Sequence, residues 1–321
     1  MSDTTSDKKG INILKIPYVA ALRPRQWTKN LIVFAAPLFA FQFTIQSLLG
    51  GILAFALFCC ASSSFYLLND IADVESDRVH PVKCKRPIAA GLISIPVATA
   101  MAIVLLTSAI GFGWLRAPAL GITIIGYSVL QVAYNLRLKR TVILDVVAIS
   151  LGFVLRACAG AAATDVHVSP WFLLCTAMLA LFLGIEKRKA ELRLAEIQGK
   201  RTRSVLKRYS PMLLSRMENT VTTGTIMTYA LWSSGPKLQG ATTSWMMLTI
   251  PFVMYGVFRY QLLSDPNEIA RRSDLGQEKG GKTERPEEIL LTDFPILLTV
   301  IAWLVLTVAI LLLKRHGLIP S

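Results

Sequence analysis

Residues 47–77 read SLLGGILAFALFCCASSSFYLLNDIADVESD, a continuous apolar run followed at once by an acidic segment. The run from Ser47 to Leu68 is long enough to cross about 30 Å of hydrocarbon as a helix. The acidic segment then supplies an amide and three carboxylates, from Asn69, Asp70, Asp73 and Asp77. This stretch predicts a membrane helix with a polar site at one end.

Similar apolar runs recur along the 321 residues, of which 53% are hydrophobic, and the mean hydropathy is +0.52. Such a composition is typical of membrane proteins. The runs are continuous, which predicts helices rather than the short alternating strands of a barrel. The predicted spans are 30–46, which Pro37 interrupts, 47–69, 94–115, 117–135, 142–163, 168–185, 212–234, 242–263 and 292–313. We therefore predict an all-α polytopic membrane protein with about nine transmembrane helices around a central cavity that opens to the cytoplasm.

The basic residues predict the orientation of the chain. If the N-terminus is cytoplasmic, 28 of the 34 Lys and Arg residues fall in cytoplasmic segments, as the positive-inside rule requires. The opposite side receives Arg116, Lys237, Lys314 and Arg315. The net charge of +14 is mostly this topological signal, so no nucleic-acid partner is expected. We expect a disordered cytoplasmic tail over 1–15 and a single catalytic membrane domain over 16–315.

The five cysteines lack a C-x-x-C pair, and most of them lie within the predicted spans. Cysteine in an apolar span usually acts as a small apolar filler, and an odd number argues against a disulfide framework. Unpaired thiols are therefore predicted at Cys59, Cys60, Cys84, Cys158 and Cys175.

The acidic segment is suited to bind a divalent cation. Residues 69, 73 and 77 are four apart and Asp70 precedes Asp73 by three, so a continuing helix would present all four on one face. Their charges would repel, and oxygen ligands of this kind suit Mg²⁺, which completes its shell with phosphate oxygens and water. We predict that Asn69, Asp70, Asp73 and Asp77 bind Mg²⁺. Donors for a phosphate follow at Lys83, Lys85 and Arg86. The alternative is a solvated acidic loop.

A second cytoplasmic segment, 134–145, combines cations with one carboxylate. Its Lys and Arg residues are either anchors of the positive-inside kind or phosphate ligands. Asp145 begins an apolar span, where a carboxylate is costly unless it faces a wet cavity or a partner. Arg156 lies eleven residues further along, about three turns and so on the same face. It either lines the cavity or forms a structural pair.

Two further basic segments flank the spans. Residues 186–208 alternate in charge and predict a solvated amphipathic helix near anionic head groups, with Lys187 and Arg188 best placed to reach a ligand. Residues 23–30 have the Trp and Arg content of an interfacial anchor, and Lys29, at the entrance of a span, could instead contact a lipid phosphate.

At these residues the chain resembles the UbiA superfamily of intramembrane prenyltransferases. That superfamily carries an N-D-x-x-D-x-x-x-D loop after its second helix, which 69–77 match, and a Y-x-x-x-x-K-x-x-x-x-x-D segment after its fourth, which Tyr134, Lys139 and Asp145 match. Shorter strings at 22–30, 152–157, 186–188, 251–252 and 259–260 are similar to the decaprenyl-phosphate phosphoribosyltransferase branch.

The resemblance implies an enzyme of the plasma membrane with cytoplasmic active-site loops. Members of that branch transfer phosphoribose from 5-phosphoribosyl 1-diphosphate (PRPP) to a polyprenyl phosphate, with Mg²⁺, in arabinogalactan synthesis for an actinobacterial cell wall. Carried over to this chain, the expected catalytic residues are Asp73, Asp77, Lys139 and Asp145. The expected substrate-binding residues are Lys29, Tyr66, Lys83, Lys85, Arg86, Tyr134, Arg137, Arg140, Arg156, Lys187 and Arg188. The chain departs from many superfamily members in lacking a second aspartate-rich motif, so the resemblance does not extend to a second metal.

Two other functions fit parts of the pattern. The first is a Mg²⁺-dependent prenyltransferase that joins a prenyl diphosphate to an aromatic acceptor, because the acidic motif cannot separate the two enzymes. The second is an organic-anion transporter, but the sequence has no repeated pair of broken half-helices. The chain length of the acceptor lipid is not encoded in any motif, and neither is assembly as a homo-oligomer.

Overall fold

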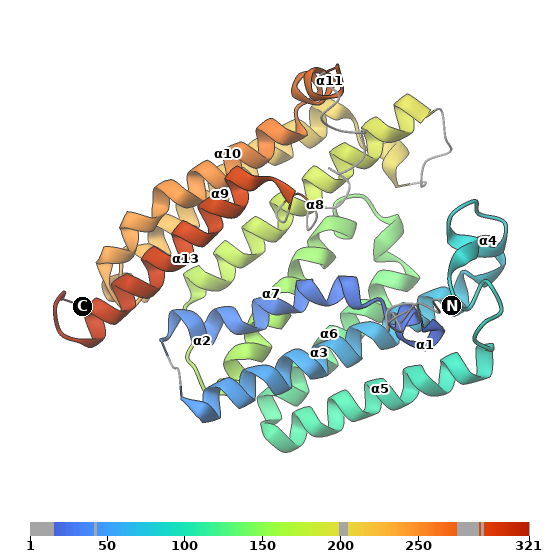
Figure 1. Ribbon diagram of the computed structural model, residues 1–321, viewed down its shortest axis with the longest axis horizontal. Coiled ribbons are helices and arrows are strands. Elements are labelled where there is room, and N and C mark those ends of the chain that lie inside the picture. The colour runs from blue at the N-terminus through green and yellow to red at the C-terminus, as the bar shows by residue number, and fades with distance from the viewer. Residues whose placement is uncertain (1–15, 42–43, 199–204, 275–288, 290–291, 321) are drawn as a thin grey trace, which may run out of the picture.

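The computed structural model describes residues 16–41, 44–198, 205–274, 289 and 292–320, which form helices and loops without a strand. Long helices cross the molecule in alternating directions (Figure 1). They are α3 (Ile45–Ala72), α5 (Ile95–Arg116), α6 (Pro118–Leu136), α7 (Leu144–Thr164), α8 (Pro170–Gln198), α9 (Pro211–Ser233), α10 (Ile250–Ser264) and α13 (Phe294–Arg315). The predicted all-α fold is confirmed. The predicted tail, 1–15, lies outside the described residues.

Seven helices of the described part are long and apolar enough to cross a membrane: α3, α5, α6, α7, α8, α13 and the helical segment Ser244–Ser264 that contains α10. Two more helical segments complete the predicted set of about nine. One is α9, which has 23 residues but carries polar side chains such as Arg216 and Glu218. The other is the N-terminal segment formed by η2 (Pro24–Phe34) and α2 (Ala35–Phe39).

The first span was predicted over 30–46, and this placement was wrong by about two turns. The helical segment starts at Pro24, whose ring suits the first position of a helix, and it ends at Phe39, two residues after Pro37. Because a 3₁₀-helix rises about 2.0 Å per residue, eleven such residues and five α-helical ones still extend about 30 Å. The hydropathy pattern gave no sign of this tighter winding.

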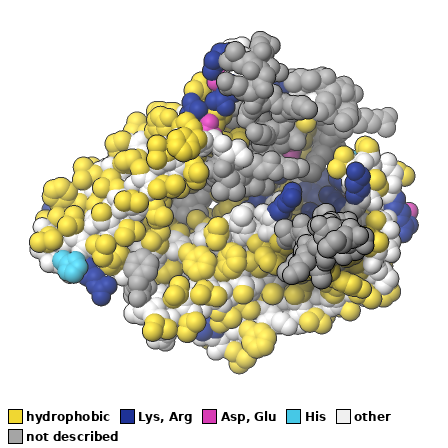
Figure 2. Space-filling model, in the orientation of Figure 1, with side chains coloured by type: hydrophobic (Ala, Val, Ile, Leu, Met, Phe, Trp, Pro, Cys, Tyr) yellow, Lys and Arg dark blue, Asp and Glu magenta, His cyan; other side chains and the backbone are white. Residues whose placement is uncertain are grey.

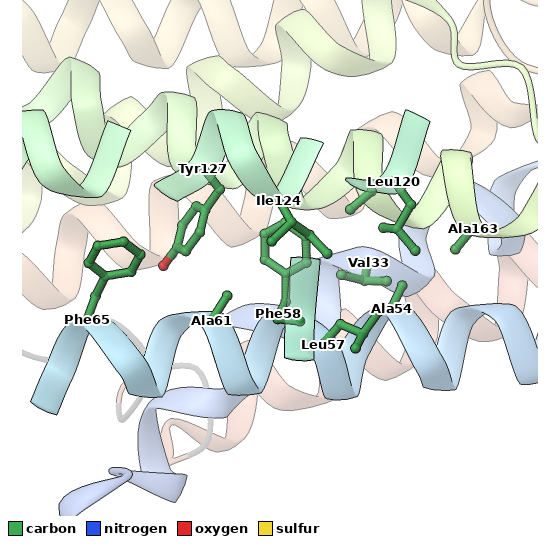
Figure 3. Packing of buried hydrophobic residues seen from close by; sticks show 12 residues of the cluster. Val33, Ala54, Leu57, Phe58, Ala61, Phe65, Leu120, Ile124, Tyr127 and Ala163 are labelled. Carbon is green, nitrogen blue, oxygen red and sulfur yellow. The ribbon is translucent and has the colours of Figure 1, made fainter. Parts of the chain in front are cut away.

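Small side chains let η2, α3, α6 and α7 pack closely. Figure 3 shows the buried cluster in which Phe58 and Phe65 of α3 meet Tyr127 of α6, while Val33 of η2 lies between α3 and α7. At Gly160 of α7 a Cβ atom would stand 1.8 Å from the Val33 carbonyl oxygen, so only glycine permits this contact. Close approach at small residues is the usual basis of helix packing in membranes.

The charged segments of the sequence meet at one end of the bundle. Figure 1 shows α4 (Val74–Arg78), the junction of α6 and α7, and the C-terminal end of α8 at this end, while the C-terminus of the chain lies at the other. The short helix η4 (Leu138–Arg140) belongs to the α6–α7 junction. Both motifs that the sequence singled out therefore lie at the same end.

A solvated amphipathic helix was predicted over 186–208, and for 186–195 this was wrong, whereas 199–204 lie outside the described residues. Helix α8 continues without a break, and Glu186 and Arg188 are 1% and 2% exposed. The charges are satisfied across the contact with α9, because the Lys189 ammonium bridges Glu186, at 3.1 Å, and Glu218. Alternating charge over 186–191 therefore reflects ion pairs inside the bundle rather than contact with water.

Candidate active site

The acidic motif lies where α3 gives way to α4. Asp73 stands at the junction with φ −97° and ψ 6°. The backbone hydrogen bonds still run from Asp73 N to Asn69 O, at 2.9 Å, and from Asp77 N to Asp73 O, at 2.8 Å. The helical spacing of Asn69, Asp73 and Asp77, which are four residues apart, is thus kept across the junction of α3 and α4.

Two carboxylates of the motif converge on one guanidinium group. Arg86 Nη1 lies 3.1 Å from Asp70 Oδ1 and 2.6 Å from Asp77 Oδ2. Arg23 also pairs with Asp70, and its guanidinium stacks 5.0 Å from the centre of the Tyr66 ring. Both carboxylates are buried, at 3% and 1% exposure, so these cations replace the water that they lack.

The oxygens of this motif are suited to a hard cation. Asp77 Oδ1 is buried without a hydrogen-bond partner among the described residues and lies 3.6 Å from Lys83 Nζ. Asn69 and Asp73 are half-buried, and the Asp73 carboxylate forms no ion pair within the described part of the chain. No three His, Cys, Asp or Glu side chains of that part are gathered as a metal site. Binding by Asn69, Asp73 and Asp77 would therefore require Arg86 and Lys83 to move toward the phosphates of a substrate.

The second motif forms a buried network instead of an open site. Asp145 is fully buried, with Oδ2 accepting from Arg188 Nε at 2.8 Å and Oδ1 accepting from the Tyr209 hydroxyl at 2.7 Å. Arg188 Nη1 also donates to Glu191 Oε2 at 2.6 Å. Both oxygens of Asp145 are thus engaged, and the carboxylate connects α7 to α8 and to the residues before α9.

Tyr209 also holds a strained turn. Ile143, the residue before α7, has φ +72° and ψ −49°, a conformation that a β-branched residue rarely adopts. Its N–H donates to the Tyr209 hydroxyl oxygen at 2.8 Å. Burial and the hydrogen bond to Asp145 raise the pKa of Tyr209 from 10.0 to about 12, so the phenol stays neutral and keeps both bonds at physiological pH.

Arg156 forms a structural cluster deep in the bundle. Its Nε donates to Asn30 Oδ1 at 2.7 Å, Nη1 to Gly152 O at 2.9 Å and Nη2 to the Tyr127 hydroxyl at 3.0 Å. Its guanidinium lies 4.8 Å from the centre of the Tyr127 ring. Asn30 in turn donates to Cys59 and Ser62 of α3. Of the two alternatives drawn from the sequence, the structure favours the structural pair. Arg156 of α7 contacts η2 and α6, and Asn30 extends the cluster to α3.

The remaining predicted residues surround the same end of the molecule. Figure 2 shows Lys and Arg side chains gathered around a hollow there. The exposed members are Lys85, Arg137 and Arg140, and the half-buried ones are Lys29, Tyr134, Lys139 and Lys187. Lys29 Nζ donates to Gln26 Oε1 at 2.6 Å. All five cysteines are free thiols, as predicted.

Sequence reasoning missed several residues of these networks. Glu191 lies in the segment predicted to be a solvated helix, and Tyr209 lies just after that segment. Arg23 lies in the segment with the content of an interfacial anchor. Asn30 offered one signal, because an amide at the start of an apolar run needs a partner. The partners themselves, 126 residues away for Asn30 and 64 for Asp145, follow only from the packing.

Carboxylates and cations gathered at one end of a bundle of membrane-spanning helices form an arrangement compatible with an integral membrane transferase. The model of the UbiA prenyltransferase family matches residues 30–275, and the chain belongs to that family.

Three curated relatives that match 89% of the chain carry the same name. A decaprenyl-phosphate phosphoribosyltransferase of Mycolicibacterium smegmatis is 36% identical over 299 residues, which is 89% of each chain. One of Corynebacterium glutamicum is 36% identical over 294 residues, covering 89% of this chain and 83% of the relative. One of Mycobacterium tuberculosis is 35% identical over 292 residues, covering 89% of this chain and 91% of the relative.

Solved structures show the same fold. A UbiA homolog from Archaeoglobus fulgidus bound to GPP and Mg²⁺ superposes with a TM-score of 0.65 at 18% identity, covering 91% of this chain and 98% of that one. The same homolog bound to DMAPP and Mg²⁺ gives a TM-score of 0.63 at 18% identity, with the same coverage. At this identity the likeness supports the fold alone.

Proposed function

We propose that this enzyme transfers the 5-phosphoribosyl group of PRPP to a polyprenyl phosphate and releases diphosphate. The observation that carries the proposal is the 36% identity over 89% of both chains to a decaprenyl-phosphate phosphoribosyltransferase. The residues of the site are compatible with this chemistry, because both substrates are anionic and the site is rich in cations.

The transfer needs no general base from the protein. An anionic oxygen of the lipid phosphate attacks C1 of the ribose and forms the new C–O bond, while the C1–O bond to diphosphate breaks and its electron pair leaves with diphosphate. C1 gains positive character in between, and negative charge develops on the leaving group. The protein therefore accelerates the reaction chiefly by stabilising that charge.

We assign the diphosphate to the motif of α3 and α4. Asn69, Asp73 and Asp77 would hold Mg²⁺, which when bound neutralises part of the diphosphate charge. Arg86 and Lys83, now paired with Asp77, would turn toward the phosphate oxygens. Asp70 has the different role of positioning Arg23 and Arg86, because it contacts both.

The cations of the α6–α7 junction and α8 would bind the other phosphates. PRPP carries a 5-phosphate some distance from C1, and the acceptor carries a phosphate of its own. Arg137, Lys139, Arg140 and Lys187 belong to a second set of cations, separate in sequence from those around the motif. Asp145 and Arg188 would set the position of this second set through the buried network.

We also propose that these loops are cytoplasmic and that the protein resides in the plasma membrane, where its product would enter arabinogalactan synthesis. The distribution of Lys and Arg supports this orientation. A single catalytic domain over 16–315 accords with the family match over 30–275.

The decisive experiment uses purified protein, Mg²⁺ and PRPP labelled in the ribose. We expect label to enter the lipid fraction, and diphosphate to be released, only when a polyprenyl phosphate is present. A prenyl diphosphate with hydroxybenzoate serves as the control pair and should give no product. Because the assay in detergent has no gradient, turnover also excludes a transporter.

The family match leaves a specific alternative, a prenyltransferase with an aromatic acceptor. Product from the prenyl diphosphate and hydroxybenzoate, with PRPP left intact, would establish that alternative. The fold and the proposed role of the aspartates would then stand, because both enzymes begin from a diphosphate.

A further inference from the structure

An apolar groove runs along the membrane-facing side of α3, α5 and α6. Its volume is about 470 Å³, within the range of sites that bind small molecules. Helix α5 forms one wall, and the other lining residues are Phe65 and Leu68 of α3 and, among those of α6, Ile125, Val129, Val132 and Leu136. We call this feature the outer groove.

The outer groove is suited to hydrocarbon. Val129 and Leu136 are 64% and 72% exposed, so the groove is open to the lipid around the bundle. Among its lining residues Ser128 is the one with a polar side chain, and its hydroxyl donates to Ile124 O at 2.7 Å. No polar group of the lining therefore needs water or a polar ligand.

The length of the outer groove matches one leaflet of a bilayer. Ile125 and Leu136 are eleven residues apart on α6, a rise of about 16 Å, whereas the hydrocarbon core of a bilayer is about 30 Å thick. Leu136 is the last residue of α6, next to η4. The groove thus begins at the end of the bundle that holds the candidate active site and extends to about the middle of the membrane.

The end of the outer groove nearest Leu136, which we call its upper end, adjoins the acidic motif of α3 and α4. Phe65, Asn69, Asp73 and Asp77 are successive members of one i, i+4 row, so Asn69 stands one turn above Phe65 on the same face of α3. A molecule lying against Phe65 in the groove therefore has its upper end beside the first ligand proposed for Mg²⁺.

Charge at the upper end of the outer groove selects an anion. Leu136 is followed by the exposed Arg137, and η4 adds Lys139 and Arg140. Asn135, just before Leu136, has a buried Oδ1 without a hydrogen-bond partner among the described residues. An apolar groove with three cations at its cytoplasmic end fits a lipid with a long hydrocarbon chain and a small anionic head.

We propose that the outer groove binds the isoprenoid chain of the acceptor lipid and holds its phosphate at the end of α6, between Asn69 and Arg137. The inference rests on the proposed function, since it assigns a place to the acceptor of that reaction. The donor and the acceptor thus approach the motif from different sides. PRPP comes from water, and the lipid comes from the membrane along α3 and α6.

The test fills the groove with a larger side chain. In Val132→Trp and Val129→Trp we expect the KM for decaprenyl phosphate to rise about tenfold, a loss of about 1.4 kcal/mol of binding. The KM for PRPP should not change, because PRPP does not enter the groove. Val104→Trp is the matched control, because Val104 is 60% exposed on α5 and does not line the groove.

Photolabelling supplies a readout that does not depend on turnover. A polyprenyl phosphate with a benzophenone in its chain should label the peptide 125–136 in the wild type and lose that label in Val132→Trp. Unchanged KM values for decaprenyl phosphate in both groove variants, or equal labelling by a benzophenone phospholipid, would overturn the proposal. If the wild type ignores PRPP yet the polyprenyl probe labels 125–136 selectively, the groove stands as a lipid site and the proposed reaction fails.

Discussion

Arg86 is the residue on which the two buried aspartates of the motif converge. One guanidinium contacts both carboxylates, and Arg23 and Lys83 add further positive charge on either side. A buried carboxylate that lost these partners would be left uncompensated, at a cost of about 3–5 kcal/mol. The same positive charges can turn toward an incoming diphosphate, because they are themselves about one third exposed.

At the scale of single residues, Asp73→Asn and Asp77→Asn should each lower kcat by about 100-fold or more, as expected when a cation that stabilises developing charge is misplaced. Turnover of PRPP by purified variants measures this. Glu75→Gln is the control, because Glu75 is exposed and pairs with Arg78. Wild-type kcat in both aspartate variants would remove the motif from the mechanism.

Tyr209→Phe should destabilise the protein and impair the α6–α7 junction. The change leaves the N–H of Ile143 and one oxygen of Asp145 without their partner, a loss of about 1–3 kcal/mol. Because the folded pKa is raised, the contribution of Tyr209 is fully present below pH 10 and is lost as the pH rises toward 12. Thermal unfolding in detergent between pH 7 and 11 tests both statements. Tyr255→Phe, at a site 48% exposed, should leave the Tm unchanged.

At the scale of elements, the hydropathy pattern predicted most helices well. Seven of the nine predicted spans agree with the helical segments to within three residues at each end. The two exceptions have physical causes. The segment from Pro24 begins among polar residues that find partners inside the bundle, such as Asn30 with Arg156. The end of α8 carries charges that pair with α9, so hydropathy alone could not place it inside.

The contact of η2 with α7 can be tested by adding one methyl group. In Gly160→Ala the Cβ atom would overlap the carbonyl oxygen of Val33, so η2 must shift away from α7. We expect a loss of about 1–3 kcal/mol of stability, typical of overpacking, together with lower activity as the Asn30–Arg156 hydrogen bond is strained. Gly256→Ala is the control, since a Cβ there meets nothing within 4 Å. An unchanged Tm in Gly160→Ala would contradict this packing.

At the scale of the whole molecule, the residues of the candidate site were predicted from the sequence more fully than the contacts that those residues make. The spacing of residues 69, 73 and 77 predicted the acidic motif. The basic segments predicted the end of the bundle at which the charged residues lie. It could not show that Asp145 is enclosed by Arg188 and Tyr209, because those partners come from distant segments. Ion pairs between helices depend on packing, which no local pattern records.

The orientation of the bundle can be tested with Cys84, the cysteine that lies outside the long helices, in the short 3₁₀ helix η3 (Lys83–Lys85) between α4 and α5. In a variant that retains only this thiol, an impermeant maleimide should label inside-out vesicles and spare intact cells. The expectation follows from the proposal that the basic segments are cytoplasmic. Labelling of intact cells would show that the topology is the reverse of the proposed one. PRPP would then have to arrive from the outer side of the membrane.

The gathering of cations at one end also bears on how the chain is made and how it can evolve. Lys and Arg beside a span favour the cytoplasmic side for that end during insertion, so under the proposed function the same side chains would serve both membrane insertion and anion binding. An exchange of Arg for Lys preserves the insertion signal but loses the planar fork that grips phosphate. Neutral replacements at Arg86 or Arg137 would weaken both roles together. Selection should therefore confine natural variation at these positions to Lys and Arg. At the opposite end of the bundle, charged residues can be replaced by uncharged polar residues.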